Sequence, residues 1–198
     1  MRLRASRWWS TGLSLTVLAT LAAFGQDDAD SEREAKVVDR FVGLLEKTPK
    51  RGTALDRVYG YHVERGTLDQ LTARYREKTA QDPKDGASWM VLGLIEAQRG
   101  RDASAVTAFS EAEKTRPDDA LASFYLGQTL VLVGRPDAAV DAFERALARK
   151  PARADSMEMY QALGRVHQRA RRDAEALKVW ERLEKQFPED ARVAEQIA

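Results

Sequence analysis

Small and large apolar residues recur at one fixed spacing through the second half of the chain. The recurring set comprises Gly93, Gly100, Ala105, Phe109, Ala112 and Pro117, matched by Gly127, Gly134, Ala139, Phe143, Ala146 and Pro151. All six pairs share the same offset, 34 in the numbering, and this agreement indicates a repeat. Because the apolar residues within a unit fall at helical spacing, each unit predicts two helices. The first helix ends at a glycine and the second before a proline.

The small residues predict close contact between the two helices of a unit. Gly93 and Ala105 are small where large side chains would hold two helices apart. A glycine inside a helix costs about 0.5–1 kcal/mol relative to alanine, so its recurrence at one site favours a packing role. Phe109, Phe143 and Trp180 each follow the small alanine by four positions and are expected to face the partner helix.

Three units can be aligned, at residues 86–119, 120–153 and 157–190. The third is offset by 37 because of three extra residues in "PARADSM". It also departs from the pattern, since Arg171 replaces the glycine of the turn and must change that turn or strain it. Glu96 takes a slot that holds Leu130 and His167 in the next units, and a hydrogen bond to a neighbouring unit is its simplest explanation.

The pattern W-x2-L-G, then A-x3-F, then P, at a period of 34, resembles the tetratricopeptide repeat (TPR). The residues that carry this resemblance are Trp89, Leu92, Gly93, Gly100, Ala105, Phe109, Pro117, Leu126, Gly127, Gly134, Ala139, Phe143, Pro151, Leu163, Gly164, Ala176, Trp180 and Pro188. The resemblance implies an all-α solenoid of antiparallel helix pairs wound into a right-handed superhelix. It also implies a protein–protein interaction scaffold of the exported bacterial type, with no catalysis of its own.

Flanking segments complete the predicted organisation. Residues 52–85 form a degenerate TPR-like unit, because Gly66, Tyr75 and Pro83 precede their counterparts by 34. Residues 34–51 are predicted to be an N-terminal capping helix. Residues 26–33 are predicted to be a disordered acidic linker, and 191–198 to begin a further helix. That helix is either a cap or a truncated repeat, in which case the chain is a fragment of a longer array.

Residues 1–25 have the layout of a secretory signal peptide. Arg2, Arg4 and Arg7 precede an uncharged, mostly apolar stretch at 11–24, and small residues lead to a predicted cut near Gly25/Gln26. We therefore expect a periplasmic or other cell-envelope location. The alternative is an uncleaved membrane anchor, although the stretch is short for a span of about 20 residues.

Charge and composition narrow the classes of partner. The chain is 43% hydrophobic and 32% charged, which is typical of a soluble helical protein. Loss of the signal peptide removes three of 32 basic residues and none of 31 acidic ones, leaving a net charge of −2. This near neutrality gives no support to nucleic-acid binding. The absence of cysteine excludes disulfides, lipidation at an N-terminal cysteine and thiolate metal sites.

The resemblance places a partner-binding groove on the first helix of each unit. The residues carried over to it are Met90, Leu94, Ala97, Leu121, Phe124, Gln128, Val131, Gln161, Arg165 and Gln168. One interpretation is that Met90, Leu94, Leu121 and Phe124 are covered by the N-terminal segment of the same chain. The other is a groove that is open to a hydrophobic helix or an extended peptide of a partner protein.

Two further features bear on function. A cluster at a helix end comprises Arg165, Arg169, Arg171 and Arg172. It is either a solvated helix terminus, where the helix dipole favours positive charge, or a docking site for an acidic partner segment. With only His62 and His167 and no phosphate-binding loop, no catalytic constellation can be assembled. We expect no metal, cofactor or small-molecule substrate. The competing functions are a structural segment of a self-associating envelope assembly, with its groove filled internally, and the N-terminal part of a longer protein with a downstream domain.

Overall fold

The computed structural model describes the backbone of residues 15–188 and the side chains of residues 31–188, and this part of the chain is entirely helical or irregular. The helices are α1 (Leu15–Lys47), α2 (Thr53–Glu64), α3 (Leu68–Gln81), α4 (Gly86–Gln98), α5 (Asp102–Thr115), α6 (Ala120–Leu132), α7 (Pro136–Ala148), α8 (Arg153–Arg169) and α9 (Asp173–Gln186). The prediction of an all-α fold is therefore confirmed.

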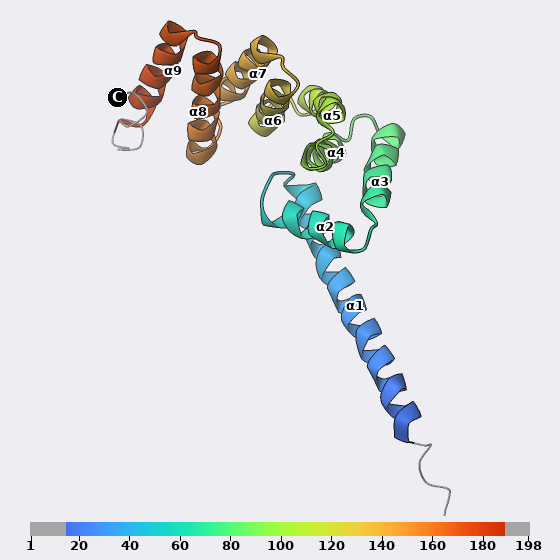
Figure 1. Cartoon of the computed structure of the whole chain (residues 1–198). Helices are drawn as coiled ribbons and strands as arrows, with labels where there is room; N and C mark the ends of the chain where they lie inside the picture. Colours follow the sequence, from blue (N-terminus) through green and yellow to red (C-terminus); the bar gives the residue numbers. More distant parts are fainter. Residues whose placement is uncertain (1–14, 189–198) are drawn as a thin grey trace, which may run out of the picture.

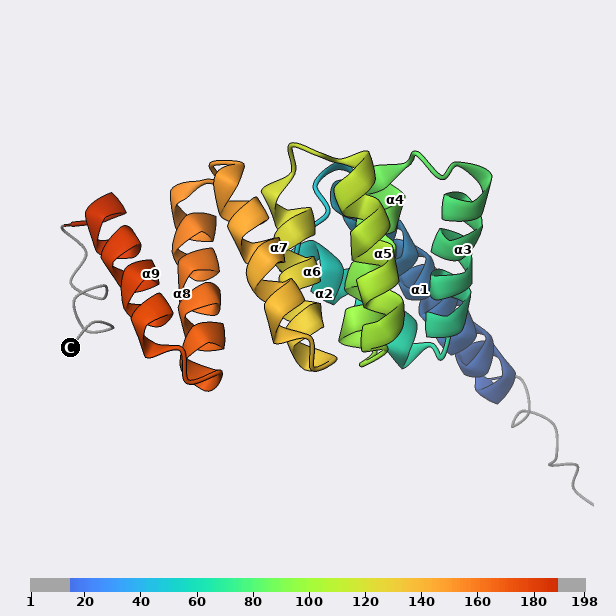
Figure 2. The same ribbon diagram turned by 90° about the horizontal axis from the view of Figure 1, so that it is seen from above.

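Helices α4 to α9 form three stacked pairs, α4/α5, α6/α7 and α8/α9 (Figure 1). Each helix packs against its partner, and the second helix of one pair packs against the first helix of the next. In the view from above, the pairs follow one another side by side along the array (Figure 2). We call α4, α6 and α8 the inner row and α5, α7 and α9 the outer row. The predicted solenoid is thus observed.

The helix pairs are joined by the same glycine–aromatic contact in every unit. A Cβ atom on Gly93 would lie 2.6 Å from the Phe109 ring, and one on Gly127 would lie 2.6 Å from the Phe143 ring. A Cβ atom on Gly164 would lie closer still to the Trp180 indole. Each ring therefore occupies the space that a side chain at the glycine would need, as the small residues of the repeat predict.

The turns within the pairs are also equivalent. Gly100 and Gly134 have positive φ angles of 70° and 73°, and the next residue donates a backbone hydrogen bond to the carbonyl five positions earlier. Such bonds satisfy carbonyls that the helix end leaves free. Arg171 adopts the same conformation, with φ 57°. The third turn therefore keeps its shape, at the cost of holding a non-glycine residue in the left-handed region.

The third unit begins earlier than predicted. Helix α8 starts at Arg153 rather than at residue 157, so the extra residues of "PARADSM" lengthen this helix. The predicted helix at 191–198 lies outside the described residues.

Residues 52–85 form two helices, but these do not pack as a TPR pair. The turn is conserved, with Gly66 at φ 64°, and α3 packs on α4 as expected of a second helix. However, α2 packs mainly against α1. The reason lies in Tyr59, which stands one repeat period before Gly93. With tyrosines at both contact positions, Tyr75 cannot approach α2, and its hydroxyl instead donates to Glu46 of α1 at 2.9 Å.

A single helix, α1, replaces the predicted linker and capping helix. It runs from Leu15 to Lys47, so residues 26–33 are helical rather than disordered, and the helix stops before residue 51. Its C-terminal part caps the array, because Val38, Val42 and Leu45 are buried while the N-terminal part projects from the body (Figure 1). Residues 1–14 of the predicted signal peptide lie outside the described part. Among the described helices, none has the length and apolarity needed to span a bilayer.

Paired charges link successive helices of the outer row. The Arg145 guanidinium donates to both carboxylate oxygens of Glu113, at 2.8 and 3.1 Å. Arg182 binds Glu144 in the same two-pronged way, at 2.7 and 3.0 Å. Bidentate pairs fix geometry as well as adding attraction. They therefore help to hold the register between α5, α7 and α9.

We predict that Gly127→Ala lowers the free energy of unfolding by about 1–3 kcal/mol, because the new methyl group overpacks the Phe143 ring. Gly60→Ala is the matched control, since a Cβ atom there has nothing within 4 Å and alanine favours the helix. Urea unfolding of both variants, followed by circular dichroism, measures the difference. Equal effects at the two positions would contradict close helix approach.

Candidate partner-binding site

The apolar half of the predicted groove is buried. Met90, Leu94 and Phe124 are at most 1% exposed. These three residues cannot contact a partner in this structure, and their assignment to the groove is corrected. The Phe124 ring lies 5.8 Å from those of Tyr125 and Phe143, so it packs between α6 and α7.

Helices α1 and α2 cover the first helix of the inner row. Both pack against α4, and Leu55 of α2 lines a small cavity of about 290 Å³ together with Leu94 and Ala97. The Tyr59 hydroxyl donates to the Gln98 carbonyl at 3.3 Å. At α4 the structure therefore agrees with the interpretation that the N-terminal segment of the same chain covers the groove.

The connector between α1 and α2, residues 48–52, is hydrogen-bonded to α6. The Arg51 backbone N–H donates to the Tyr125 hydroxyl at 3.1 Å, and its guanidinium donates to the Gln128 side-chain carbonyl. The same guanidinium lies 4.9 Å from the centre of the Tyr125 ring, within the range of a cation–π contact. Burial raises the pKa of the Tyr125 hydroxyl, which keeps it neutral. The connector thus ends the covered part of the inner row.

Beyond the connector, the inner row remains accessible. Gln161, Leu121, Gln128 and Val131 are half-buried, and Arg165 and Gln168 are exposed. The structure brings these six predicted groove residues onto neighbouring helices, α6 and α8. The Gln128 amide donates to Glu158 at 3.4 Å and so links the two helices. We call the surface formed by Leu121, Gln128, Val131, Gln161, Arg165 and Gln168 the inner face.

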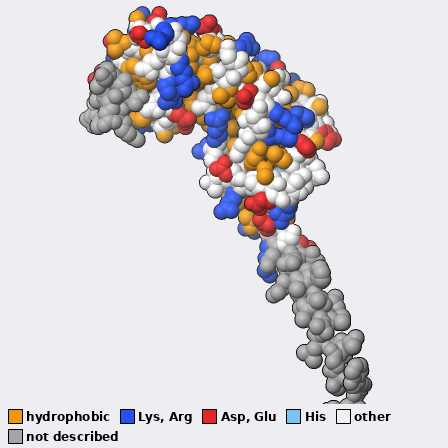
Figure 3. Space-filling model, in the orientation of Figure 1, with side chains coloured by type: hydrophobic (Ala, Val, Ile, Leu, Met, Phe, Trp, Pro, Cys, Tyr) orange, Lys and Arg blue, Asp and Glu red, His pale blue; other side chains and the backbone are white. Residues whose placement is uncertain are grey.

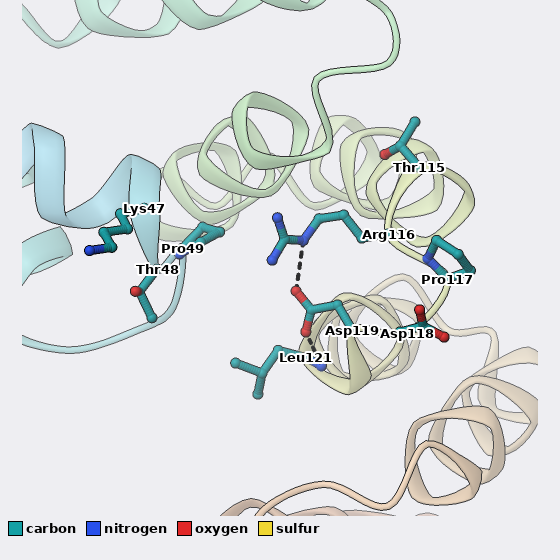
Figure 4. Close-up of a pocket in the computed structure, with 9 residues that line it drawn as sticks. All are labelled: Lys47, Thr48, Pro49, Thr115, Arg116, Pro117, Asp118, Asp119 and Leu121. Atoms are coloured by element: carbon teal, nitrogen blue, oxygen red, sulfur yellow. Dashed lines mark hydrogen bonds and ion pairs between the residues drawn. The ribbon is translucent and has the colours of Figure 1, made fainter.

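A pocket of about 560 Å³ opens at the edge of the inner face (Figure 4). Residues 47–49 form one wall, and residues 115–119 with Leu121 form the other. The Asp119 carboxylate is already engaged, because it accepts from Arg116 Nε at 2.8 Å and from the Leu121 backbone N–H at 2.9 Å. Asp119 therefore caps α6, and the pocket offers space beside Leu121 rather than a free carboxylate on Asp119.

The buried ionisable side chains Glu96 and His167 contribute to helix packing. Glu96 is 1% exposed, and its carboxylate accepts from Arg76 of α3 at 2.5 Å, as the expected bond to a neighbouring unit. His167 is buried, and its pKa is lowered first by burial and then by the charge of Arg172. Across the described residues, no group of three or more His, Cys, Asp or Glu side chains could hold a metal ion.

The arginine cluster divides into two parts. Arg172 Nη2 lies 2.5 Å from the Asp137 carboxylate of α7, so this residue links two units. Arg165, Arg169 and Arg171 have no side-chain ion pair within the described part of the chain. Sequence alone could not separate them, since the partner of Arg172 lies 35 positions away.

Sequence reasoning missed the residues that border the inner face. Arg51 and Tyr125 are 74 positions apart, and neither belongs to the repeat signature. Their contact depends on α2 leaving the position that a regular first helix would take. The sequence holds one indication of this arrangement. Tyr59 occupies the position that is glycine in the other units, which indicates a helix pair that cannot pack closely.

Comparisons with known proteins agree with the fold. The family model described as cytochrome c-type biogenesis protein H TPR domain matches residues 38–194. No curated protein matches the chain.

Solved structures agree as well. A crystal structure of MamA is 21% identical, covering 71% of this chain and 80% of that chain, with a TM-score of 0.59. A TPR protein of Thermus thermophilus is also 21% identical, covering 88% and 94%, at 0.53. YrrB, described as a TPR protein with an unusual peptide-binding site, is 16% identical, covering 79% of each chain, at 0.55. At these identities the structures show the fold alone, and the TPR prediction is confirmed.

We predict that His167 makes the fold less stable in mild acid. Its pKa in the folded state is below the ordinary value of about 6.5, so the unfolded chain binds the proton more readily. Stability is therefore complete above about pH 6.5 and falls as the pH decreases. His167→Leu, which copies the residue at the same slot of the second unit, is expected to lose less stability than the parent chain between about pH 7.5 and 5.5.

Melting temperatures at the two pH values measure this effect. His62 also has a lowered pKa and should account for part of the dependence that remains in the His167→Leu variant. An identical loss in the variant and the parent would contradict a role for His167.

Proposed function

Because the chain belongs to the family of the cytochrome c-type biogenesis protein H TPR domain, we propose that it is a non-catalytic scaffold in cytochrome c-type biogenesis. Its inner face binds a segment of another polypeptide. The observation that carries the proposal is the accessibility of the inner face on α6 and α8, beside a first helix that is already covered. YrrB, which has a similar fold, is described as having a peptide-binding site, which is consistent with this use of such an array.

The polar character of the inner face defines the type of contact. The apolar positions Met90, Leu94 and Phe124 are buried, so a hydrophobic helix finds few anchors. Side-chain amides and arginines instead offer hydrogen bonds, which fix an extended segment through its backbone. The same distinction argues against an internally filled, purely structural array, because the N-terminal segment covers α4 and reaches α6 only through Arg51.

Export from the cytoplasm forms part of the proposal. It is supported by the basic start, the apolar stretch at 11–24 and the small residues before Gln26. An exported chain without cysteine must be held by packing, and the repeated glycine–aromatic contacts supply that packing in each pair. The scaffold would then act in the periplasm or elsewhere in the cell envelope.

Site-specific photo-crosslinking tests the proposed binding face. A benzophenone amino acid placed at Gln161 or Gln168 is expected to form a covalent adduct with one partner protein in the intact cell envelope. The same group at Lys178 on α9, which is exposed and on the outer row, is the control and should give no such adduct.

Identification of the adduct then tests the process. A c-type cytochrome, or a protein of its assembly, is the expected partner. Adducts formed equally at inner and outer positions, or a partner unrelated to cytochrome c assembly, would contradict the proposal.

Mass spectrometry of the chain recovered from fractionated cells tests export. We expect a periplasmic form that begins at Gln26, and retention in the cytoplasm when Arg2, Arg4 and Arg7 are replaced by glutamate. A full-length form in the membrane fraction would support the alternative of an uncleaved anchor. A full-length form in the cytoplasm would contradict export.

A further inference from the structure

Within the described part of the chain, two arginines on the inner row form no ion pair. Arg165 and Arg169 are exposed and make no ion pair or side-chain hydrogen bond to any described residue. By contrast, Arg145 of α7, Arg182 of α9 and Arg172 in the turn before α9 all bind carboxylates of another unit. Arg165 and Arg169 therefore do not serve the stacking of the array.

Their placement on α8 is unfavourable for the isolated protein. Arg165 and Arg169 are four positions apart, so they lie on one face of the helix and repel each other. The residues three or four positions from Arg165 are Gln161, Ala162 and Gln168, none of which is acidic. The helix dipole favours positive charge only within the last turn, which accounts for Arg169 but not for Arg165.

The amides beside the arginines favour an extended ligand. Gln161 and Gln168 flank Arg165 on the inner face and make no side-chain hydrogen bond within the described part of the chain. An amide group both donates and accepts, and so it matches the N–H and C=O groups of a chain that is not helical. A helical ligand has already paired its own backbone groups.

The charged side chains around the inner face also indicate at which end of α8 acidic groups of a ligand are favoured. Glu158 lies about two helical turns before Arg165 on α8, next to Gln128 and thus to Arg51. This carboxylate repels acidic groups there. Elsewhere, positive and negative side chains are interspersed over the visible surface (Figure 3). The positive charge of the two arginines therefore favours acidic residues at the Arg165–Arg169 end of α8.

We propose that the inner face, together with Arg169 at the C-terminal end of α8, binds an extended acidic segment of the partner protein. Its carboxylates pair with Arg165 and Arg169, while Gln161 and Gln168 hold its backbone. This inference rests on the proposed function and adds the chemistry of the partner. Two charge-assisted hydrogen bonds supply specificity for acidic side chains, and the amides supply register along the segment.

Selection from a random peptide library tests the proposal. Short linear peptides, displayed on phage, are selected on the immobilised chain and on two double variants. Arg165→Ser with Arg169→Ser removes the proposed contacts. Arg40→Ser with Arg57→Ser is the matched control, because these exposed arginines lie on α1 and α2, away from the inner face. We expect enrichment of Asp and Glu by the parent and the control, and its loss in the first variant.

Binding of one enriched peptide, measured by fluorescence anisotropy, makes the test quantitative. Loss of both arginines is expected to weaken binding about tenfold or more, and binding to the parent should weaken as salt is added. The control variant should bind within about twofold of the parent. Since all four arginines are exposed, the variants should fold, and circular dichroism checks this.

The outcomes separate the two proposals. Enriched peptides without acidic residues, bound equally well by the Arg165→Ser, Arg169→Ser variant, would overturn the acidic segment and leave a binding face in place. Absence of any enriched peptide, together with absence of crosslinks at Gln161 and Gln168, would overturn the scaffold itself. Self-association of the parent that is abolished in the same variant would identify a second copy of the chain as the ligand, and would overturn the choice of a separate partner.

Discussion

The contact between a helix glycine and the aromatic ring of the following helix determines how far apart the helices of this array lie. It occurs at Gly93 with Phe109, at Gly127 with Phe143 and at Gly164 with Trp180. In each unit the ring fills the space left by the missing side chain. Where the glycine is replaced, by Tyr59, the pair fails to close, although the turn at Gly66 is kept. The three pairs that close therefore all have the small residue, and the pair that lacks it does not close.

The pair that fails to close also shapes the proposed binding surface. Because α2 leaves α3, it joins α1 and covers α4, and the intervening connector reaches α6 through Arg51. An array of regular units would expose its inner row along its whole length. Here the inner row is divided into an apolar part, sealed by the chain itself, and a polar part on α6 and α8. Under the proposed function, this division leaves only the polar part of the inner row for a partner.

Sequence predicts the repeated part of the fold because its determinants are local. The small residues and the turn glycines act within single units, which recur every 34 residues. The structure places both sets of residues as the sequence predicts. Even the departure at Arg171 is visible in the sequence, although only the structure shows that the turn keeps its conformation. Composition favours a linker for the acidic stretch at 26–33, whereas helix propagation from both sides makes it part of α1.

The proposed binding face is harder to predict because its determinants are distant in the chain. Family positions place Met90, Leu94 and Phe124 in the groove, but burial depends on which elements pack over them. Phe124 turns to Phe143, and the contact between Arg51 and Tyr125 spans 74 positions. Periodicity identifies which residues share a face, but not whether another segment covers that face. The polar positions on α8 are accessible because nothing in the described chain packs over them.

A double-mutant cycle between Gly127 and Phe143 tests the central contact most directly. Phe143→Leu removes the ring that fills the space beside the glycine, so Gly127→Ala should then cost much less than it does in the parent chain. We expect an interaction free energy of about 1–2 kcal/mol between the two positions, measured by urea unfolding. Effects that add within about 0.5 kcal/mol would show that the ring and the glycine do not depend on each other, and would contradict the glycine–ring contact as the determinant of helix spacing.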